Sequence, residues 1–364
     1  MASQPAVPKP SRPAIHIHFN VQSQFKVQPA TTRKASRKTH AFRKAERAEY
    51  MSEFFSTLRL TGVSGKVKPF IPRGFANGLA LCYKRAMKFS IVTPSFRNSQ
   101  WLKLCIASVA DQQHVELEHI VQDSCSDDGI QDWLPHDRRV KAFIEKDGGM
   151  YDAVNRGYRR ATGDILAYLN CDEQYLPGAL KTIHDFFEAH PQTEVALAGT
   201  IVTDGEGKYI CHRHLMVPHP QHVWFRFPVL TSSVFIRRRV VHERGIFFDP
   251  RWCDLGDFHW VLALMKNEVP MKVLDYFTSV FADTGENMNL KPNAIREKNE
   301  TLAMTPAWVR ILKPIWILHH RLRRLAAGHF LLKPTSYSIY TLASPEQRVR
   351  FDVSKPTAVW WNRL

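Results

Sequence analysis

The sequence lacks the features that mark disulfide-bonded, secreted and membrane-spanning chains. Its six cysteines include no Cys-x-x-Cys pair, a distribution typical of reduced thiols in a cytosolic protein. No stretch approaches the roughly 18 uncharged apolar residues that a bilayer-spanning helix needs. Residues 1–14 contain no apolar signal core, which argues against secretion. We therefore expect a cytoplasmic protein.

Acidic residues are scarce at both ends of the chain. The whole chain has 50 basic and 34 acidic residues and a formal net charge of +16. Residues 1–86 hold 16 basic and 3 acidic side chains, residues 87–290 hold 21 and 27, and residues 291–364 hold 13 and 4. The basic ends suggest a nucleic-acid-binding protein as one alternative, yet the basic stretch 31–47 contains a single aromatic residue, Phe42. We therefore expect no nucleic-acid partner.

The sequence divides into four regions. Residues 1–86 are rich in Pro, Ser, Thr and basic residues, so we expect disorder there, with Met87 as a second possible start of translation. Strand-like and helix-like segments alternate from Met87 onward, which predicts an α/β domain with a mostly parallel sheet flanked by helices. We divide this domain into residues 87–200 and 201–290, and a basic C-terminal region, 291–364, follows.

Acidic residues follow three of the predicted strands. Asp123 ends one strand, and Asp147 comes shortly after another. Asp172 and Glu173 follow a third, buried strand. Ligands of α/β sheets bind beyond the carboxyl ends of the strands, so these acids should share one crevice. Adjacent buried carboxylates are costly unless a cation neutralises them, which favours Mg²⁺ or Mn²⁺ over the alternative of a solvated acidic turn.

Four segments between Phe89 and Leu180 carry a family pattern: FSIVTPSFRNSQWLKLCIASVADQ, HIVQDSCSDDG, EKDGGMYDAVNRGYRRATGDILAYLNCDE and PGAL. In these segments the chain resembles the nucleotide-sugar domain of family 2 inverting glycosyltransferases, which have the Rossmann-like GT-A fold. The resemblance implies a nucleoside diphosphate sugar as donor, with a UDP-sugar favoured. It further implies a Mn²⁺ or Mg²⁺ cofactor and a saccharide or lipid-linked acceptor in surface polysaccharide biosynthesis. Residues 87–200 would then bind the donor and residues 201–290 the acceptor.

The resemblance assigns the nucleotide sugar to loops that follow the predicted strands. The loop of Thr93, Pro94 and Ser95 would lie against the nucleoside. Asp123 and Asp147 would contact the nucleoside side, and Lys146 would meet phosphate. These residues, with an asparagine at the end of the fourth strand, are Thr93, Pro94, Ser95, Asp123, Lys146, Asp147 and Asn170.

Asp172 and Glu173 match the metal-binding acids of the family. The family usually reads Ser-Asp-Asp, whereas this chain has Cys171 in place of the serine and Glu173 in place of the last aspartate. A non-catalytic homologue therefore stays an alternative. A nucleotidyltransferase is disfavoured because TPSFRNSQ, after the first strand, contains no glycine.

The segment SSVFIRRRVVHERGIFFDPRWCDLGDFHWVLAL resembles, more weakly, the acceptor segment of the family. By this match Asp257 is the general base that takes a proton from the acceptor hydroxyl, and Asp254 is the second choice. The alternative role for Asp257 is a helix N-cap.

Residues 305–330 interleave apolar residues, including Trp308 and Trp316, with basic ones, and Pro314 lies inside the run. This pattern predicts an amphipathic helical tail on the inner face of the plasma membrane. The alternative is a packed helix with a solvated basic face. A neighbouring group of possible zinc ligands has irregular spacing, so we predict no zinc site from Cys211, His212, His214, His219 and His222.

Overall fold

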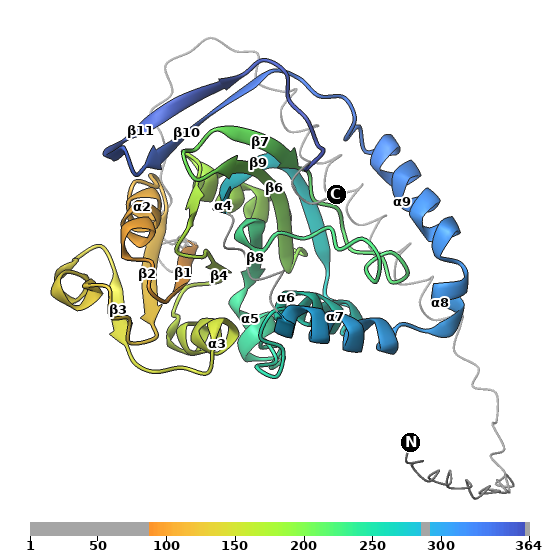
Figure 1. Ribbon diagram of the computed structural model, residues 1–364, viewed down its shortest axis with the longest axis horizontal. Helices are drawn as coiled ribbons and strands as arrows, with labels where there is room; N and C mark the ends of the chain where they lie inside the picture. Colours follow the sequence, from red (N-terminus) through yellow and green to blue (C-terminus); the bar gives the residue numbers. More distant parts are fainter. Residues whose placement is uncertain (1–86, 285–291, 361–364) are drawn as a thin grey trace, which may run out of the picture. The chain divides into compact units, whose positions relative to one another are not determined.

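The computed structural model describes residues 87–284 and 292–360 (Figure 1). The predicted disordered region and the start at Met87 concern residues 1–86, which lie outside the described residues. Within the described ranges, nine strands form one sheet in the order β3-β2-β1-β4-β8-β6-β9-β5, with β7 paired to β6. The strands are β1 (Lys88–Ser95), β2 (Glu116–Asp123), β3 (Lys141–Ile144), β4 (Ile165–Tyr168), β5 (Glu173–Tyr175), β6 (Val195–Asp204), β7 (Tyr209–Arg213), β8 (Val234–Arg237) and β9 (Met271–Asp283).

The first half of the sheet is parallel. β1 pairs in parallel with β2 and β4, and β2 pairs in parallel with β3. The β1–β2 register sets Ser95 opposite Asp123, so both strands end at the same edge. In the second half only β6 and β9 pair in parallel, while β8, β7 and β5 join antiparallel. The expected α/β sheet is confirmed.

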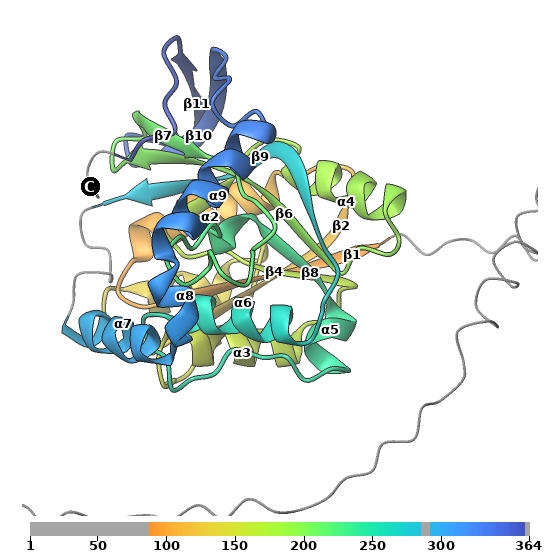
Figure 2. The same cartoon turned by 90° about the vertical axis from the view of Figure 1, so that its right-hand side faces the viewer.

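Helices cover both faces of the sheet (Figure 2). α2 (Ser99–Ala110) and α4 (Ala179–Ala189) pack on one face through Cys105, Val109 and Leu180. The other face is covered by α3 (Met150–Arg160), α5 (Arg238–His242) and α6 (Gly256–Lys266). Each helix thus buries one apolar side, as the helical spacing predicts. Short 3₁₀ turns complete this part: η1 (Ile130–Asp132), η2 (Leu134–His136) and η3 (Thr231–Ser233).

The C-terminal region contains three helices and a hairpin. The helices are α7 (Pro292–Met304), α8 (Ala307–Ile311) and α9 (Lys313–Ala326). The run that contains Pro314 is divided into α8 and α9, and the proline lies in the first turn of α9, where it is tolerated. No described helix is long and apolar enough to cross a bilayer.

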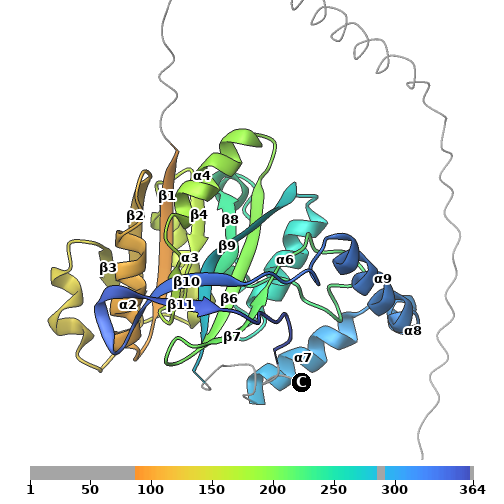
Figure 3. The ribbon, with the colours of Figure 1, turned by 90° about the horizontal axis from the view of Figure 1, so that it is seen from above.

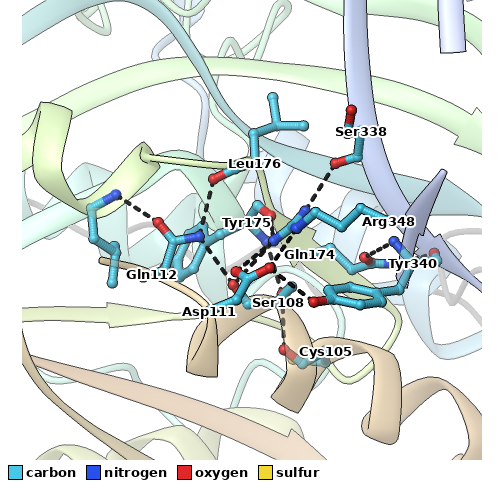
Figure 4. Close-up of polar contacts among 11 residues, drawn as sticks. Cys105, Ser108, Asp111, Gln112, Gln174, Tyr175, Leu176, Ser338, Tyr340 and Arg348 are labelled. Carbon is cyan, nitrogen blue, oxygen red and sulfur yellow. Dashed lines mark hydrogen bonds and ion pairs between the residues drawn. The ribbon is translucent and has the colours of Figure 1, made fainter. Parts of the chain in front are cut away.

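The hairpin of β10 (Thr335–Thr341) and β11 (Ser344–Val353) was not expected from the sequence (Figure 3). Tyr337 and Ile339 pack with residues of β6 and β9. Arg348 anchors the hairpin to α2, because its guanidinium donates to the Asp111 carboxylate at 2.6 and 2.9 Å and to the Tyr175 carbonyl at 3.0 Å (Figure 4). The hairpin is therefore part of the domain.

Candidate active site

A cavity of about 620 Å³ opens at the carboxyl ends of β1 and β4 and is closed on its far side by the loop before α6. Its volume lies in the range of sites for small-molecule ligands. Residues from both halves of the domain line it. Nine of the eleven site residues expected from the sequence are among them: Pro94, Ser95, Lys146, Asp147, Asn170, Asp172, Glu173, Asp254 and Asp257.

Thr93 and Asp123 lie outside the lining. The Thr93 hydroxyl is buried 2.9 Å from Nε2 of His119. The Asp123 carboxylate accepts from the backbone NH of Ser126 at 2.8 Å and from its hydroxyl at 2.7 Å. Asp123 thereby shapes the loop behind the cavity, and a direct contact with a nucleoside stays a prediction for both residues.

Asp172 and Glu173 form an acidic pair on one wall, where β4 runs into β5. The buried Glu173 carboxylate accepts from the backbone NH of Asn170 at 2.9 Å and from the Ser232 hydroxyl. Burial, and then the charge of Asp172, raise the pKa of Glu173 to about 8. Asp172 keeps some exposure to the cavity, but desolvation still raises its pKa to about 6. The pair is therefore electrostatically strained when both groups are ionised.

The donor atoms of this wall fit a hard divalent cation. The Asn170 side-chain oxygen and the Ser95 hydroxyl are buried without a hydrogen-bond partner among the described residues. Together with the two carboxylates they give an all-oxygen set, which Mg²⁺ and Mn²⁺ prefer. A cation would also relieve the repulsion that raises the pKa of Glu173.

The loop after β3 adds a polar edge to the same wall. The Asp147 carboxylate accepts from the Ser124 hydroxyl at 3.0 Å and from the backbone NH of Gly149 at 2.9 Å. Gly149 has φ +118°, a conformation that favours glycine, and α3 begins at the next residue. Lys146 lies with its ammonium 5.7 Å from the ring of Phe96, which also lines the cavity and is 50% exposed. No pattern in the sequence pointed to Phe96 as a site residue.

Asp257 lies on the opposite wall, in the first turn of α6. Leu255 is the N-cap of that helix, so Asp257 does not take the alternative N-cap role. Its carboxylate accepts from the backbone NH of Phe258 at 2.7 Å and from the Tyr151 hydroxyl. Burial raises the pKa of Asp257 to about 6 despite these hydrogen bonds. A carboxylate with such a pKa can accept a proton near neutral pH.

Tyr151 reaches Asp257 because Gly256 lets α3 and α6 approach closely. A Cβ atom at Gly256 would lie 2.5 Å from the Tyr151 ring. Burial and the charge of Asp257 hold the pKa of Tyr151 well above its ordinary value, so the hydroxyl stays protonated and donates. Tyr151 belongs to the DGGMYDAVNRG segment, but its partner could not be inferred from spacing.

Asp254 is held by α7 through a residue that sequence reasoning missed. The carboxylate of Glu297 is fully buried and accepts from the backbone NH groups of Cys253, Asp254 and Leu255 at 2.8, 3.0 and 2.9 Å. Although burial acts to raise the pKa of Glu297, these NH groups lower it below the ordinary value. The Asn293 amide donates both to the Asp254 carboxylate and, at 2.9 Å, to Glu297. Glu297 therefore fixes the loop that leads to Asp257.

Comparison with known proteins identifies the domain that contains this cavity. Residues 90–249 match the family model described as Glycosyl transferase family 2. The chain carries a family 2 glycosyltransferase domain. The resemblance in the strand and loop motifs is thereby confirmed. The matched range includes the wall with Asp172 and Glu173 but ends before Asp254 and Asp257.

Curated relatives of the glycosyltransferase domain match over parts of their length. A teichuronic acid biosynthesis glycosyltransferase of Bacillus subtilis is 31% identical over 102 residues, which are 27% of this chain and 40% of the relative. A GalNAc(5)-diNAcBac-PP-undecaprenol β-1,3-glucosyltransferase of Campylobacter jejuni is 31% identical over 26% of this chain and 33% of its own length. A PGL/p-HBAD biosynthesis glycosyltransferase of Mycobacterium bovis is 29% identical over 62% and 87%. The chain thus spans 40% and 33% of the first two curated relatives it matches.

The fold of the glycosyltransferase domain also has a solved counterpart. S. aureus TarS 1–349, in complex with UDP-GlcNAc, superposes with a TM-score of 0.50 at 19% identity, over 59% of this chain and 64% of that chain. The likeness supports the GT-A-type α/β fold expected from the sequence.

Proposed function

We propose that the chain is a metal-dependent, inverting glycosyltransferase that moves a sugar from a nucleoside diphosphate sugar to a saccharide or lipid-linked acceptor. The observation that carries the proposal is one cavity with two separate acidic walls. Asp172 and Glu173 lie on one wall, and the half-buried Asp257 lies on the other. The relative in C. jejuni is named for transfer to an undecaprenol-linked acceptor, and the TarS structure contains a UDP-sugar. We favour a UDP-sugar donor and a role in surface polysaccharide biosynthesis.

On this proposal the first wall holds the donor. Pro94, Ser95, Lys146 and Asp147 lie where the nucleoside and diphosphate would bind, and the Phe96 ring offers a face for the base. Asp172 is the carboxylate that we assign to the metal, because Glu173 already accepts from Asn170 and Ser232. When bound there, Mg²⁺ or Mn²⁺ neutralises charge on the departing nucleoside diphosphate.

On the second wall, Asp257 acts on the acceptor. Its carboxylate takes the proton of the acceptor hydroxyl as that oxygen attacks the anomeric carbon. The Tyr151 hydroxyl donates to the same carboxylate and orients it. Attack from the face opposite to the diphosphate inverts the anomeric centre.

A donor-release assay tests the proposal. The protein is incubated with a panel of nucleotide sugars in the presence of Mn²⁺, Mg²⁺ or EDTA, and the released nucleoside diphosphate is measured. We expect metal-dependent release that is lost in Asp172→Asn. Asp185→Asn is the matched control, because Asp185 is exposed on α4 and pairs with Lys181. Absence of binding to every nucleotide sugar would contradict the proposal and favour a non-catalytic homologue.

The same proposal includes contact with a membrane surface through α8 and α9. Side chains at a helical spacing of four and three residues are more than half exposed on one face: Ile311, Ile315, Leu318, Leu322 and Leu325. Part of the basic side contacts the domain, since Arg323 donates to the Val217 carbonyl at 3.0 Å and the Lys313 ammonium lies 5.3 Å from the Phe225 ring. Arg310 and Arg321 are exposed. An exposed apolar helix face of this kind suits the headgroup region of a bilayer. We accordingly propose a location on the inner face of the plasma membrane.

Liposome flotation tests this contact. The full chain should float with anionic vesicles, and Ile315→Glu/Leu322→Glu should reduce the floated fraction strongly. Leu342→Glu is the control, because Leu342 is 44% exposed on the distant hairpin turn. Equal flotation of all three proteins would contradict membrane contact through α9.

A further inference from the structure

Three histidines come together away from the active-site cavity. His219 and His222 lie in the connection between β7 and η3, and His319 lies in the middle of α9 (Figure 1). Each offers one ring nitrogen, and these nitrogens lie within 4.8 Å of one another. Nε2 of His222 is 3.0 Å from Nδ1 of His319. In the described part of the chain this is the group of metal-ligating side chains that converges most closely.

The backbone brings the three rings together from two directions. The NH groups of His222 and Val223 donate to the His219 carbonyl at 3.0 and 3.1 Å, and this tight turn stacks the two rings with centroids 4.1 Å apart. Arg323, one turn beyond His319, holds α9 against the same connection through the Val217 carbonyl. His319 therefore lies on a helix that a separate contact holds against the same connection.

The site is enclosed and its hydrogen bonding is incomplete. His222 is only 3% exposed, and its Nδ1 is buried without a hydrogen-bond partner among the described residues. Hydrogen bonds normally satisfy buried polar atoms, and an exception calls for an explanation such as a bound ion or water. Nδ1 of His222 is such an exception, whereas Nε2 of His222 is within hydrogen-bond distance of Nδ1 of His319.

The donor set selects the kind of ion. Imidazole nitrogen suits zinc and neighbouring transition metals, whereas Mg²⁺ and Ca²⁺ prefer oxygen. Zinc binds histidine at about 2.0–2.1 Å with tetrahedral geometry, so two ligating nitrogens lie roughly 3.3 Å apart. The 3.0 Å between His222 and His319 is close to that separation. The charge of Arg323 opposes a dication at this place and limits its affinity.

We propose that His219, His222 and His319 bind a zinc ion that fastens α9 to the connection between β7 and η3. The ion would cross-link side chains 97 residues apart in the sequence, at a helix whose apolar face we assign to the membrane. Three protein ligands leave the fourth position to water. This site is separate from the acidic wall that binds the catalytic metal, and the inference does not rest on the proposed function.

A second histidine group supplies the control. His214 lies near His212 and His329 with ring centroids 5.1 and 5.0 Å apart. In that group the Tyr209 hydroxyl occupies Nδ1 of His212, and Nδ1 of His214 pairs with Asp275 at 3.2 Å. His214→Ala removes a comparable half-buried imidazole but should leave the proposed zinc site intact.

The test is metal binding by the untagged full chain after treatment with EDTA. Zinc is titrated in competition with a chromophoric chelator, and Co²⁺ is used as a probe whose tetrahedral nitrogen sites absorb more strongly in the visible than octahedral oxygen sites. We expect one zinc and the tetrahedral Co²⁺ spectrum in wild type and in His214→Ala. His319→Ala should weaken zinc binding by more than the roughly 10–100-fold that loss of an outer-shell partner costs.

Two further results decide the interpretation. His319→Gln guards against a folding defect of the alanine variant, and both should keep the far-UV circular dichroism of wild type. Zinc should raise Tm in wild type and in His214→Ala but not in the His319 variants. Zinc affinity that is unchanged in His319→Ala, or Co²⁺ bound only in an octahedral oxygen site, would overturn the proposal.

Discussion

The two walls of the active-site cavity differ in how the chain builds them. On the donor wall, Glu173 has one local partner, the backbone NH of Asn170 three residues before it, but the Ser232 hydroxyl also donates to it and its strand β5 pairs with β9. On the acceptor wall, the loop that leads to Asp257 is held by Glu297, which lies more than forty residues later on α7. Both walls reach beyond the family match, which ends at residue 249, but the acceptor wall also needs a helix of the C-terminal region.

This difference has a chemical counterpart. The donor wall carries an acidic pair suited to a cation that arrives with its ligand. The acceptor wall carries the half-buried carboxylate of Asp257, and its orientation depends on the Tyr151 hydroxyl and on the loop. We infer that changes on the acceptor wall should affect turnover more than donor binding, and the predictions below are chosen to test that separation.

The largest effect is expected for Asp257→Asn. The amide cannot take a proton, so kcat should fall by roughly 10²–10⁴-fold, the usual contribution of general base catalysis. The affinity for nucleoside diphosphate, measured by calorimetry with Mn²⁺ present, should stay within about twofold of wild type because the donor wall is untouched. Asp254→Asn should have a smaller effect on kcat, and a reversed ranking would make Asp254 the base.

A smaller loss is expected for Glu297→Gln. The neutral amide weakens charge-assisted hydrogen bonds to three backbone NH groups, each worth about 1.5–3 kcal/mol. The loop before α6 should loosen, so kcat/KM for the acceptor should fall about 10–100-fold with donor affinity unchanged.

Glu300→Gln is the matched control for that change. Glu300 lies on the same helix but is exposed and pairs with Arg296. Pure destabilisation would lower donor affinity and acceptor turnover together, and that outcome would count against a positioning role for Glu297.

The contrast between the walls also explains how far the sequence could predict the molecule. The acids of the donor wall follow buried strands, and parallel strands bring their carboxyl ends to one edge, so the crevice could be inferred before the structure. Glu297 could not be inferred, because nothing in the α7 sequence indicates that a glutamate there accepts three hydrogen bonds from another loop. Such long-range polar contacts leave no periodic pattern in the sequence.

The C-terminal region shows the same limit. Its amphipathic pattern located the helix α9, but the pattern did not reveal that Arg323 and Lys313 contact the domain. The sequence also did not predict the structural role of Arg348, which anchors the hairpin to Asp111. The irregular spacing of the histidines argued against zinc, and the sequence did not reveal that His319 of α9 lies beside His219 and His222.

The pH dependence should separate the two walls further. Burial raises the pKa of Asp257 to about 6, and the base must be ionised, so kcat/KM should fall about tenfold per pH unit below pH 6. Because the folded pKa is above the unfolded one, the protonated carboxyl favours the fold, and this stability is lost as pH rises from about 4 through about 6. In EDTA at pH 7.5, Asp257→Asn should therefore raise Tm by roughly 2–4 °C, and at pH 4 it should not. An equal change in Tm at both pH values would show that the change does not come from ionisation of Asp257.

The smallest effect on turnover is expected for Arg348→Met, which tests whether the donor wall is independent of the C-terminal region. Arg348 is largely buried and joins the hairpin to Asp111 and to the carbonyl of Tyr175, on the strand that begins with Glu173 (Figure 4). Arg348→Met should lower Tm, because it leaves the Asp111 carboxylate and the Tyr175 carbonyl without this donor. Polar groups left unpaired in a partly buried site cost about 1–3 kcal/mol. Arg350→Met, two residues along the same strand, removes an exposed arginine that pairs with Asp352 and should leave Tm unchanged.

If the donor wall is independent of the C-terminal region, kcat and the Mn²⁺ concentration for half-maximal activity should stay within about twofold in both variants. A several-fold rise in the Mn²⁺ requirement of Arg348→Met alone would mean that the hairpin holds β5 in place, and the donor wall would then depend on the C-terminal region as the acceptor wall does.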